Sequence, residues 1–304
     1  MISDKWDNKK YMMDILQYDG YRLKYASKRL KNDRDIVVKA IIDYGGNIRY
    51  ASDNLKNDRE LFLFSVERGN SLNNMPSYLK NDYDNALMFI NRDGYNIIYF
   101  DKKIQNDRNL VLMAVKNNPY VLPKLSSKFR NDKEIIIEAL QKNGLVLNYL
   151  SDKFKNDKEI VMIAIISNPL SLRYASNEIR NDKDLVLFSV QKNAYCFKFA
   201  SKELRNDKKM ILNTLRSDAI SLKFASKVLQ NNKDFVIDAI KINGYSLQYA
   251  SDEIQKNKKI ILLALKNIYF IDYNRFKNSN RVSPGIQFDP KFLKKKFRKI
   301  LELF

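Results

Sequence analysis

The stretch that decides the fold runs from Asn156 to Asp182 and reads NDKEIVMIAIISNPLSLRYASNEIRND. It opens on an Asn-Asp pair, and the same pair returns 25 residues later at its end. The apolar residues from Ile160 to Ile165 recur at the spacing of one helix face, which predicts a first helix. Asn168 and the proline after it are typical of a helix end. Apolar residues three and four apart between Leu172 and Ile179 predict a second, shorter helix.

The Asn-Asp pair recurs along the chain in steps of 25 residues, with one step of 24. It begins at Asn32, Asn57, Asn81, Asn106, Asn131, Asn156, Asn181 and Asn206, with degenerate forms at Asn231 and Lys256 and an Asp7-Asn8 pair before them. Helices this short do not fold alone, but they bury their apolar faces when they stack on neighbours. The sequence therefore predicts an all-α solenoid of about ten 25-residue helix-turn-helix repeats over residues 1–275.

Most columns of the repeat have a structural interpretation. The Asn-Asp pair supplies helix N-caps, and Glu159 stands where a capping box has its carboxylate. A serine column is expected to serve small-residue packing and local backbone bonding. An aromatic column can pack between repeats or offer stacking platforms for bases, and packing is favoured because the column adjoins a buried alanine. The serines are Ser27, Ser52, Ser126, Ser151, Ser176, Ser201, Ser226 and Ser251, and the aromatic residues are Tyr25, Tyr50, Tyr99, Tyr149, Tyr174, Phe199, Phe224 and Tyr249.

The C-terminal segment, residues 276–304, departs from the repeat. An irregular linker is expected first, followed by an amphipathic helix over residues 291–304. That helix is expected to cap the stack, since solenoids need a polar end. The alternative is that its basic face binds a membrane surface or a partner groove. The basic residues are Lys294, Lys295, Lys296, Arg298 and Lys299.

The composition excludes most enzyme chemistry. The chain has no histidine, one cysteine (Cys196) and no Gly-rich phosphate loop, so the common acid–base groups, zinc ligands and nucleotide cradles are missing. We expect no catalytic site, no metal site and no cofactor. The N-terminus does not resemble a signal peptide and no apolar run is long enough to span a bilayer, so a soluble, intracellular protein is expected.

The net charge of +20 points instead to a polyanionic partner. One column, of the Arg34 type, lies between two mostly acidic columns and is expected to be neutralised locally; its members are Arg34, Arg59, Arg108, Lys133, Lys158, Lys183 and Lys208. The exposed face of the second helix is different, because its many cations face only Asp53, Asp152 and Asp252. Its basic residues are Lys24, Lys28, Lys31, Arg49, Lys56, Lys80, Lys102, Arg130, Lys155, Arg173, Arg180, Lys198, Lys202, Arg205, Lys223 and Lys227.

Two interpretations of that basic face remain open. It can be a solvated lysine surface in a protein of lysine-rich composition, or it can follow a phosphate backbone without reading sequence. We expect a non-enzymatic scaffold that binds protein through an extended solenoid surface. The alternative is sequence-nonspecific binding of RNA or DNA along this face. A membrane surface is the weakest of the three partners, and no small-molecule substrate is expected.

The repeat unit, with its Leu172-Arg173-Tyr174-Ala175-Ser176 string and the Asn181-Asp182 pair that follows, resembles a family of tandem repeats described only as a domain of unknown function. The resemblance covers about residues 8–266, and one family unit is similar to two of the 25-residue repeats. It is weakest between Met75 and Leu125. Members of the family occur in amoeba-infecting giant viruses and some protists, so the resemblance implies a helical repeat fold and a location in a host cytoplasm or a virion. It implies no activity.

Overall fold

The computed structural model describes residues 5–278, with side chains up to residue 269. This range contains helices and no strand. The chain divides into two compact units, which we call the N-terminal unit (residues 1–139) and the C-terminal unit (residues 140–304). Within the described range, none of the helices combines the length and the apolar character that crossing a bilayer requires.

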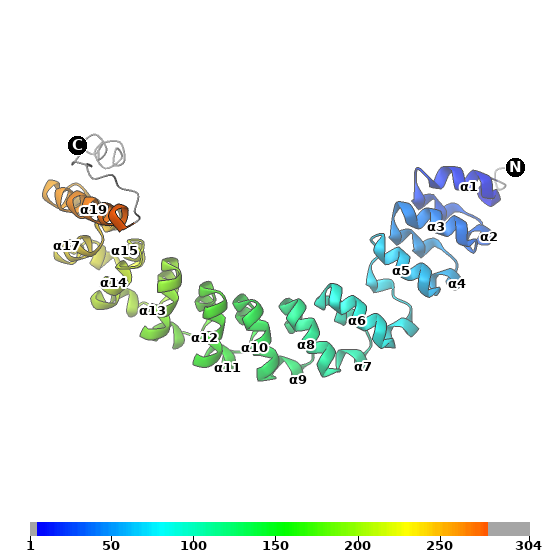
Figure 1. Ribbon diagram of the computed structural model, residues 1–304, viewed down its shortest axis with the longest axis horizontal. Helices are drawn as coiled ribbons and strands as arrows, with labels where there is room; N and C mark the ends of the chain where they lie inside the picture. Colours follow the sequence, from blue (N-terminus) through cyan, green and yellow to red (C-terminus); the bar gives the residue numbers. More distant parts are fainter. Residues whose placement is uncertain (1–4, 279–304) are drawn as a thin grey trace. The chain divides into compact units, whose positions relative to one another are not determined.

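Each repeat begins with a regular α-helix, the first helix. Figure 1 shows these helices side by side within each unit. In α12, Ile160, Val161, Ala164 and Ile165 are fully buried, which confirms the predicted core face. The first helices are α1 (Lys9–Leu16), α3 (Arg34–Asp43), α5 (Arg59–Glu67), α6 (Tyr83–Arg92), α8 (Arg108–Asn117), α10 (Lys133–Lys142), α12 (Lys158–Ser167), α13 (Lys183–Lys192), α14 (Lys208–Leu215), α17 (Lys233–Ile242) and α19 (Lys258–Asn278).

The second helix of each repeat is broken in two, which the sequence pattern did not predict. Its first half is in most repeats a six-residue 3-10 segment that starts directly after the first helix. Asn168 ends α12 and also accepts a hydrogen bond from the amide of Leu170, so one asparagine closes one element and opens the next. These segments are η2 (Gly20–Tyr25), η3 (Gly45–Tyr50), η4 (Leu72–Asn74), η6 (Gly94–Tyr99), η7 (Pro119–Lys124), η8 (Gly144–Tyr149), η9 (Pro169–Tyr174), η11 (Ala194–Phe199), α15 (Ser221–Phe224) and η13 (Gly244–Tyr249).

The second half is a single short turn, separated from the first half by an alanine or a larger apolar residue with extended backbone. Ala175, for example, has φ −67° and ψ 160°. In several repeats the serine that follows caps the new turn, as Ser27 does by accepting from the amide of Leu30. Ser126, Ser151 and Ser251 make no such cap bond. The turns are α2 (Lys28–Lys31), α4 (Asp53–Lys56), η5 (Ser77–Asn81), α7 (Lys102–Gln105), α9 (Ser127–Arg130), α11 (Asp152–Lys155), η10 (Ile179–Asn181), η12 (Leu204–Asn206), α16 (Lys227–Gln230) and α18 (Asp252–Gln255); a further 3-10 turn, η1 (Lys5–Asp7), precedes α1.

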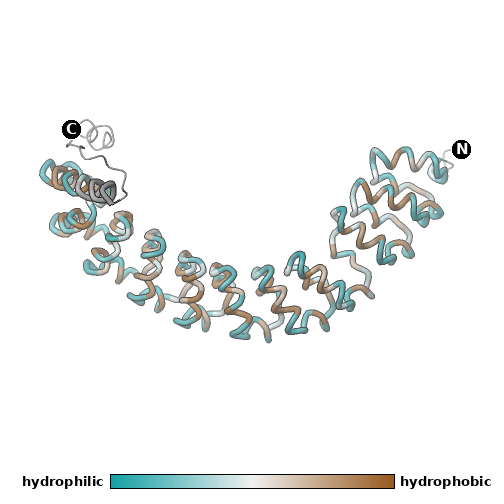
Figure 2. Tube along the Cα trace, viewed as in Figure 1, coloured by the Kyte–Doolittle hydropathy of each residue, from teal (hydrophilic) through white to brown (hydrophobic). Residues whose placement is uncertain are grey.

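The core of each unit lies between its two rows of helices. Each first helix packs against its own 3-10 segment and against that of the repeat before it, as α3 does with η2 and η3 and α12 does with η8 and η9. Figure 2 shows hydrophobic and hydrophilic residues alternating along the helices of both units. No short element has a core of its own, so the repeats are stable only as a stack.

The serine column joins consecutive repeats by backbone hydrogen bonds. The amide of Ser201 donates to the carbonyl of Arg180 in the preceding repeat at 2.8 Å, and the amide of Ser226 donates to that of Arg205 at 3.2 Å. The hydroxyl of Ser201 also donates to the side-chain oxygen of Asn181 at 2.6 Å. The same pattern recurs at Ser52, Ser176 and, for the backbone bond, Ser251. The local bonding predicted for the serines is therefore confirmed, and it extends to the neighbouring repeat.

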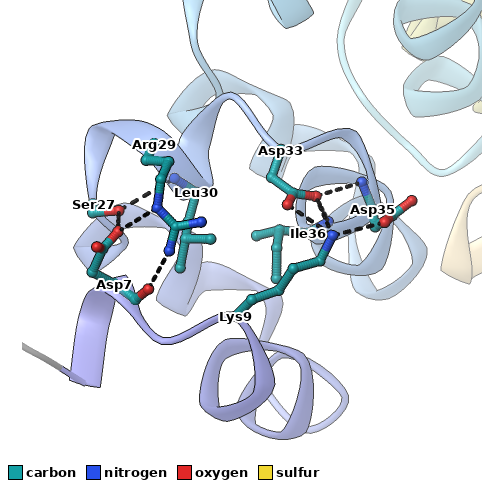
Figure 3. Close-up of polar contacts among 8 residues, drawn as sticks. All are labelled: Asp7, Lys9, Ser27, Arg29, Leu30, Asp33, Asp35 and Ile36. Atoms are coloured by element: carbon teal, nitrogen blue, oxygen red, sulfur yellow. Dashed lines mark hydrogen bonds and ion pairs between the residues drawn. The ribbon is translucent and has the colours of Figure 1, made fainter.

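Capping by the Asn-Asp pair is confirmed, and the aspartate is the residue of the pair that caps the next first helix. Glu159 then lies at the second position of α12 and not at the third, which a capping box requires. Asp157 accepts from the amides of Glu159 at 2.9 Å and Ile160 at 3.2 Å. Figure 3 shows the same arrangement at Asp33, whose carboxylate also receives the Lys9 ammonium at 2.8 Å. Partial burial acts to raise the pKa of Asp33, but the hydrogen bonds from Lys9 and from the amide of Ile36 outweigh it and hold the pKa below its ordinary value.

The 24-residue step alters the junction between α5 and α6. Gly69, at φ +90°, lies directly after α5 in the left-handed region that favours glycine. Asn70 is buried there and donates to the Ser65 hydroxyl at 2.9 Å. The second layer is reduced at this junction to η4 and η5. Ser71 caps η4 by accepting from the amide of Asn73, whereas η5 follows Pro76 without a side-chain cap.

The C-terminal predictions fall mainly outside the described residues. The helix α19 continues to Asn278, well beyond the length of the other first helices. The irregular linker was expected from residue 276, but residues 276–278 continue α19. The rest of the linker and the amphipathic helix with Lys294, Lys295, Lys296, Arg298 and Lys299 lie outside the part of the chain that the structure describes.

Candidate binding surfaces

The predicted basic face divides into three columns, and two of them are exposed. The first column lies on the 3-10 segments and the second at the start of the short turns. Both project into solvent. The first column consists of Lys24 and Arg49 in the N-terminal unit and Arg173, Lys198 and Lys223 in the C-terminal unit; the second consists of Lys28 and Lys102 in the former and Lys202 and Lys227 in the latter.

The third column is mostly half-buried and has a structural role. The Arg205 guanidinium folds back to donate to the carbonyls of Ala200 at 3.2 Å and Phe224 at 3.4 Å. Gln230, at the equivalent position one repeat later, donates to the carbonyls of Leu222, Lys223 and Ala225 at the break of its own second helix. At Arg205 the column thus satisfies carbonyls that the broken helix leaves open. Elsewhere in the column Arg180 donates to the side-chain oxygen of Asn177, and Lys56 pairs with Asp53. It contains Lys31, Lys56, Lys80, Arg130, Lys155, Arg180 and Arg205, of which Arg130 is the exposed member.

The Arg34-type column is neutralised where the sequence analysis expected it, by carboxylates of the following repeat. Arg108 pairs with Asp132 at 2.8 Å and also with Glu134, and Lys183 pairs with Asp207 at 2.9 Å. Arg34 and Lys158 make equivalent pairs. In the same column Arg59 donates instead to the side-chain oxygen of Asn85.

Lys208 contradicts that expectation. Its partner would be the capping residue of the next repeat, and this residue is Asn232 in place of aspartate. The neighbour of Lys208 in the helix, Lys209, stands where Glu134, Glu159 and Asp184 stand in other repeats. Lys208 and Lys209 make no ion pair with any described residue. The signal was present in the sequence, since the Asn-Asp pair degenerates to Asn-Asn at Asn231.

The unpaired cations of three consecutive repeats form one surface in the C-terminal unit, which we call the basic patch. No ion pair to a described residue neutralises any of its members. The row of 3-10 segments is continuous beneath it, because η9 packs on η11 and η11 on α15. The basic patch consists of Lys198, Lys202, Arg205, Lys208, Lys209, Lys223, Lys227 and Lys233, and Arg173 adjoins it.

A cleft of about 400 Å³ opens at the edge of the basic patch, between the short turns η10 and η12. Arg180, Lys202 and Arg205 contribute cations to it, and Glu203 contributes one carboxylate. The Nε of Arg180 is buried there and has no hydrogen-bond partner. The remaining lining residues are Asn177, Ala200 and Ser201.

Part of the aromatic column packs between repeats, as expected, and carries cations of the first column, whereas Tyr25 and Tyr149 are each 52% exposed. The rings of Tyr195 and Phe224, from adjacent repeats, meet edge to face at 5.3 Å. Lys198 lies over the ring of Tyr195 at 5.4 Å, and Arg173 lies over those of Tyr174 and Phe199. Tyr195 remains 40% exposed, so its ring is only partly used in packing.

A second surface was missed by the sequence analysis. One position in the middle of the first helix is apolar in every repeat, yet no residue there is fully buried by stacking. In α6 this residue is Leu87, 37% exposed, and Met88 beside it is 47% exposed. The sequence signal that could have revealed this surface is that the position is apolar in each repeat. The column, called the apolar column below, comprises Val38, Leu63, Leu87, Leu112 and Ile137 in the N-terminal unit and Met162, Leu187, Leu212, Ile237 and Leu262 in the C-terminal unit.

Other chemistry finds little support. Among the described side chains, no three His, Cys, Asp or Glu residues cluster as a metal site requires. Cys196 is buried, and this burial raises the pKa of its thiol, which makes the thiolate a minor species at neutral pH.

Comparison with known proteins agrees with the repeat architecture. Seven stretches match the family model described as a domain of unknown function, DUF4116: residues 8–56, 39–80, 82–130, 107–151, 132–180, 182–230 and 232–276. No curated protein and no solved structure matches the chain. Several of the matches span two of the 25-residue repeats, as the sequence resemblance implied. The matches together cover most of the chain, which therefore belongs to the DUF4116 family of tandem helical repeats.

Proposed function

We propose that the protein is a non-enzymatic scaffold that binds a partner protein along the first helices of its stacked repeats. The apolar column carries this proposal. An apolar residue recurs there in all repeats, although stacking leaves each of them in contact with solvent. Packing against the core accounts for part of this character, as at Val38 and Ile237, but Leu87 and Leu262 are 37% and 64% exposed. A partner that covers the column accounts for the exposed apolar residues, because the core of a protein interface is apolar and is buried by the partner.

The test uses Leu87 of the apolar column and Met88 beside it. A tagged wild-type chain and its Leu87→Ser/Met88→Ser variant are compared by quantitative proteomics after native purification. Both side chains are more than a third exposed, so the variant is expected to fold. The control is Ile42→Ser/Ile166→Ser, which removes equally exposed apolar residues outside the column. A protein retained by wild type and control but lost from the variant supports the proposal. Identical protein profiles for all three chains contradict it.

A second candidate function is sequence-nonspecific nucleic-acid binding, and the unpaired cations of the basic patch favour it. Lysines of the Arg34-type column that stabilise the stack are paired with carboxylates, whereas Lys198, Lys202, Lys223 and Lys227 have none. Affinity for phosphate backbones falls steeply with salt, because protein binding releases the counterions that surround the nucleic acid. Titration of RNA and duplex DNA at physiological salt tests this function. Micromolar binding with a steep salt slope supports it, and no binding at that salt excludes it.

A further inference from the structure

The basic patch departs from the repeat at positions where the rest of the chain places carboxylates. Lys209 replaces an acidic residue, and Asn232 and Asn257 replace the aspartates that would neutralise Lys208 and Lys233. Asparagine still caps the helix, since Asn232 accepts from the amide of Phe235 at 2.9 Å. These changes therefore remove negative charge and keep the fold.

The cations at Lys208 and Lys209 do not stabilise the helix that carries them. Both lie in the first turn of α14, where the positive end of the helix dipole repels a positive charge. The first turn of α12 has Lys158 at the position of Lys208 but Glu159, which the dipole favours, at the position of Lys209, so the departure from the repeat lies at Lys209. An anionic ligand would compensate both the dipole and the unpaired lysines. The placement of these charges thus points to binding and not to folding.

The cleft beside the patch is suited to a phosphate group. The unpartnered Nε of Arg180 lies buried in it, and Lys202 adds a mobile ammonium at its rim. A volume of about 400 Å³ lies at the lower end of the range for sites that enclose one small molecule. It is suited to one sugar–phosphate segment, while the open face of the patch continues the backbone path past Lys208 and Lys233.

The side chain of Tyr195 indicates that a nucleic acid bound at the basic patch would be single-stranded. Its partly exposed ring lies among the cations of the patch, directly beside Lys198. Proteins that bind single strands combine a positive track with aromatic rings on which bases stack. A duplex offers its phosphates but keeps its base faces covered. The equivalent position holds leucine or isoleucine at Leu145, Leu170 and Ile220 and tyrosine at Tyr21, Tyr95, Tyr120 and Tyr245, so packing accepts an aromatic ring there without requiring one.

We propose that the basic patch binds single-stranded nucleic acid, with a phosphate in the cleft at Arg180 and a base against Tyr195. This inference rests on the second candidate function and locates it in the C-terminal unit. It also extends the predicted basic face around the edge of the stack to Lys208, Lys209 and Lys233.

The test is a variant that restores the repeat pattern, Lys209→Asp/Asn232→Asp/Asn257→Asp. Every new residue occurs at the equivalent position of other repeats, so the variant is expected to fold with unchanged or higher thermal stability. The control, Lys10→Glu/Lys142→Glu, makes the same change in net charge at two exposed lysines away from the patch. Full-length chains are titrated into fluorescein-labelled oligo(dT) and oligo(U) of 20 nucleotides, and into a duplex of equal length, between 50 and 200 mM salt.

The pattern-restoring variant is expected to bind the single strands at least tenfold more weakly than wild type. The magnitude of its salt slope should fall by about 2, the value for three lost contacts with a single strand. Tyr195→Leu should weaken binding roughly fivefold or more without altering the salt slope. The control should bind like wild type.

Each contrary outcome overturns a distinct part of the account. If wild type binds no nucleic acid at 150 mM salt, the second candidate function itself fails. If wild type binds and the pattern-restoring variant binds equally well, the patch is not the site. If the duplex binds as tightly as the single strands, or if polyglutamate competes as effectively as oligo(dT), the assignment to single-stranded nucleic acid is wrong.

Discussion

Replacement of Asp207 by alanine separates the two roles that the Asn-Asp pair has in every junction. The Asp207 carboxylate accepts from the amides of Lys209 at 2.9 Å and Met210 at 3.1 Å, and it receives the Lys183 ammonium at 2.9 Å. Loss of an N-cap costs about 1 kcal/mol. The ion pair is exposed on its lysine side and adds only a few tenths of a kcal/mol. We therefore expect Asp207→Ala to destabilise α14 by about 1–1.5 kcal/mol.

Two further variants measure how much of this loss of stability comes from the ion pair and how much from the helix cap. Lys183→Ala removes the ion pair and leaves the cap, so it should cost at most about 0.5 kcal/mol. Asp207→Asn removes the charge and keeps an acceptor for the helix amides, as Asn232 does in the next repeat. Its cost should lie near that of Lys183→Ala. A cost equal to that of Asp207→Ala would instead mean that charge, and not capping, holds the junction.

Local hydrogen exchange is the appropriate assay, because a stack of repeats does not unfold in one step that reports a single junction. The amides of Ile211 to Leu215 should exchange roughly tenfold faster in Asp207→Ala, as a loss of about 1.4 kcal/mol implies. Those of α12, a repeat away from the change, serve as the internal reference. Unchanged exchange in α14 would refute the capping role of the Asn-Asp pair.

The remaining predictions concern pH, packing and the serine column. The hydrogen bond from Lys183 and that from the Met210 amide lower the pKa of Asp207 against the opposing effect of burial. The contribution of the Asp207 carboxylate to stability is therefore complete above the ordinary aspartate pKa of about 3.9 and is lost as pH falls through the folded-state pKa. The stability cost of Asp207→Ala, measured by hydrogen exchange, should shrink below about pH 4. Gly144→Ala should destabilise the C-terminal unit by about 1–3 kcal/mol in urea denaturation, because the added Cβ would lie 2.0 Å from the Ala164 carbonyl oxygen; an unchanged midpoint would show that this approach relaxes freely. Ser226→Ala should cost about 1 kcal/mol by the same measurement, since it removes both the bond to Asn206 and the cap of α16.

The sequence predicted the elements that rest on local periodicity and capping. The first helices, the Asp caps and the paired cations follow from the apolar spacing and from the Asn-Asp pair, because a cap needs only a side chain and the amides two and three residues later. The break in the second helix was not predictable from apolar spacing. It depends on the bond from the Ser176 amide to the Lys155 carbonyl, which belongs to another repeat.

The candidate surfaces were predicted less completely, because they also depend on contacts between residues that are distant in the sequence. Arg205 looked like a free cation in the sequence, but the carbonyls of the broken helix bind its guanidinium. Lys208 looked neutralised because its column lies between two mostly acidic columns. The residue that would pair with it lies 24 positions later and is Asn232. Exposure of Leu87 depends on how closely the next first helix packs, which no local pattern contains.

The central claim is that the amides of Ser52, Ser176, Ser201, Ser226 and Ser251 join their repeats to the preceding ones and leave other surfaces free to bind. Amide exchange at these serines tests it most directly. The amides of Ser176, Ser201 and Ser226 donate to the preceding repeat, whereas the next amide along, such as that of Lys227, lies in the first turn of a helix and has no backbone acceptor. We predict slow exchange at each serine and fast exchange at the residue that follows it. Equal exchange at the two positions, repeat after repeat, would contradict the stacking on which the account depends.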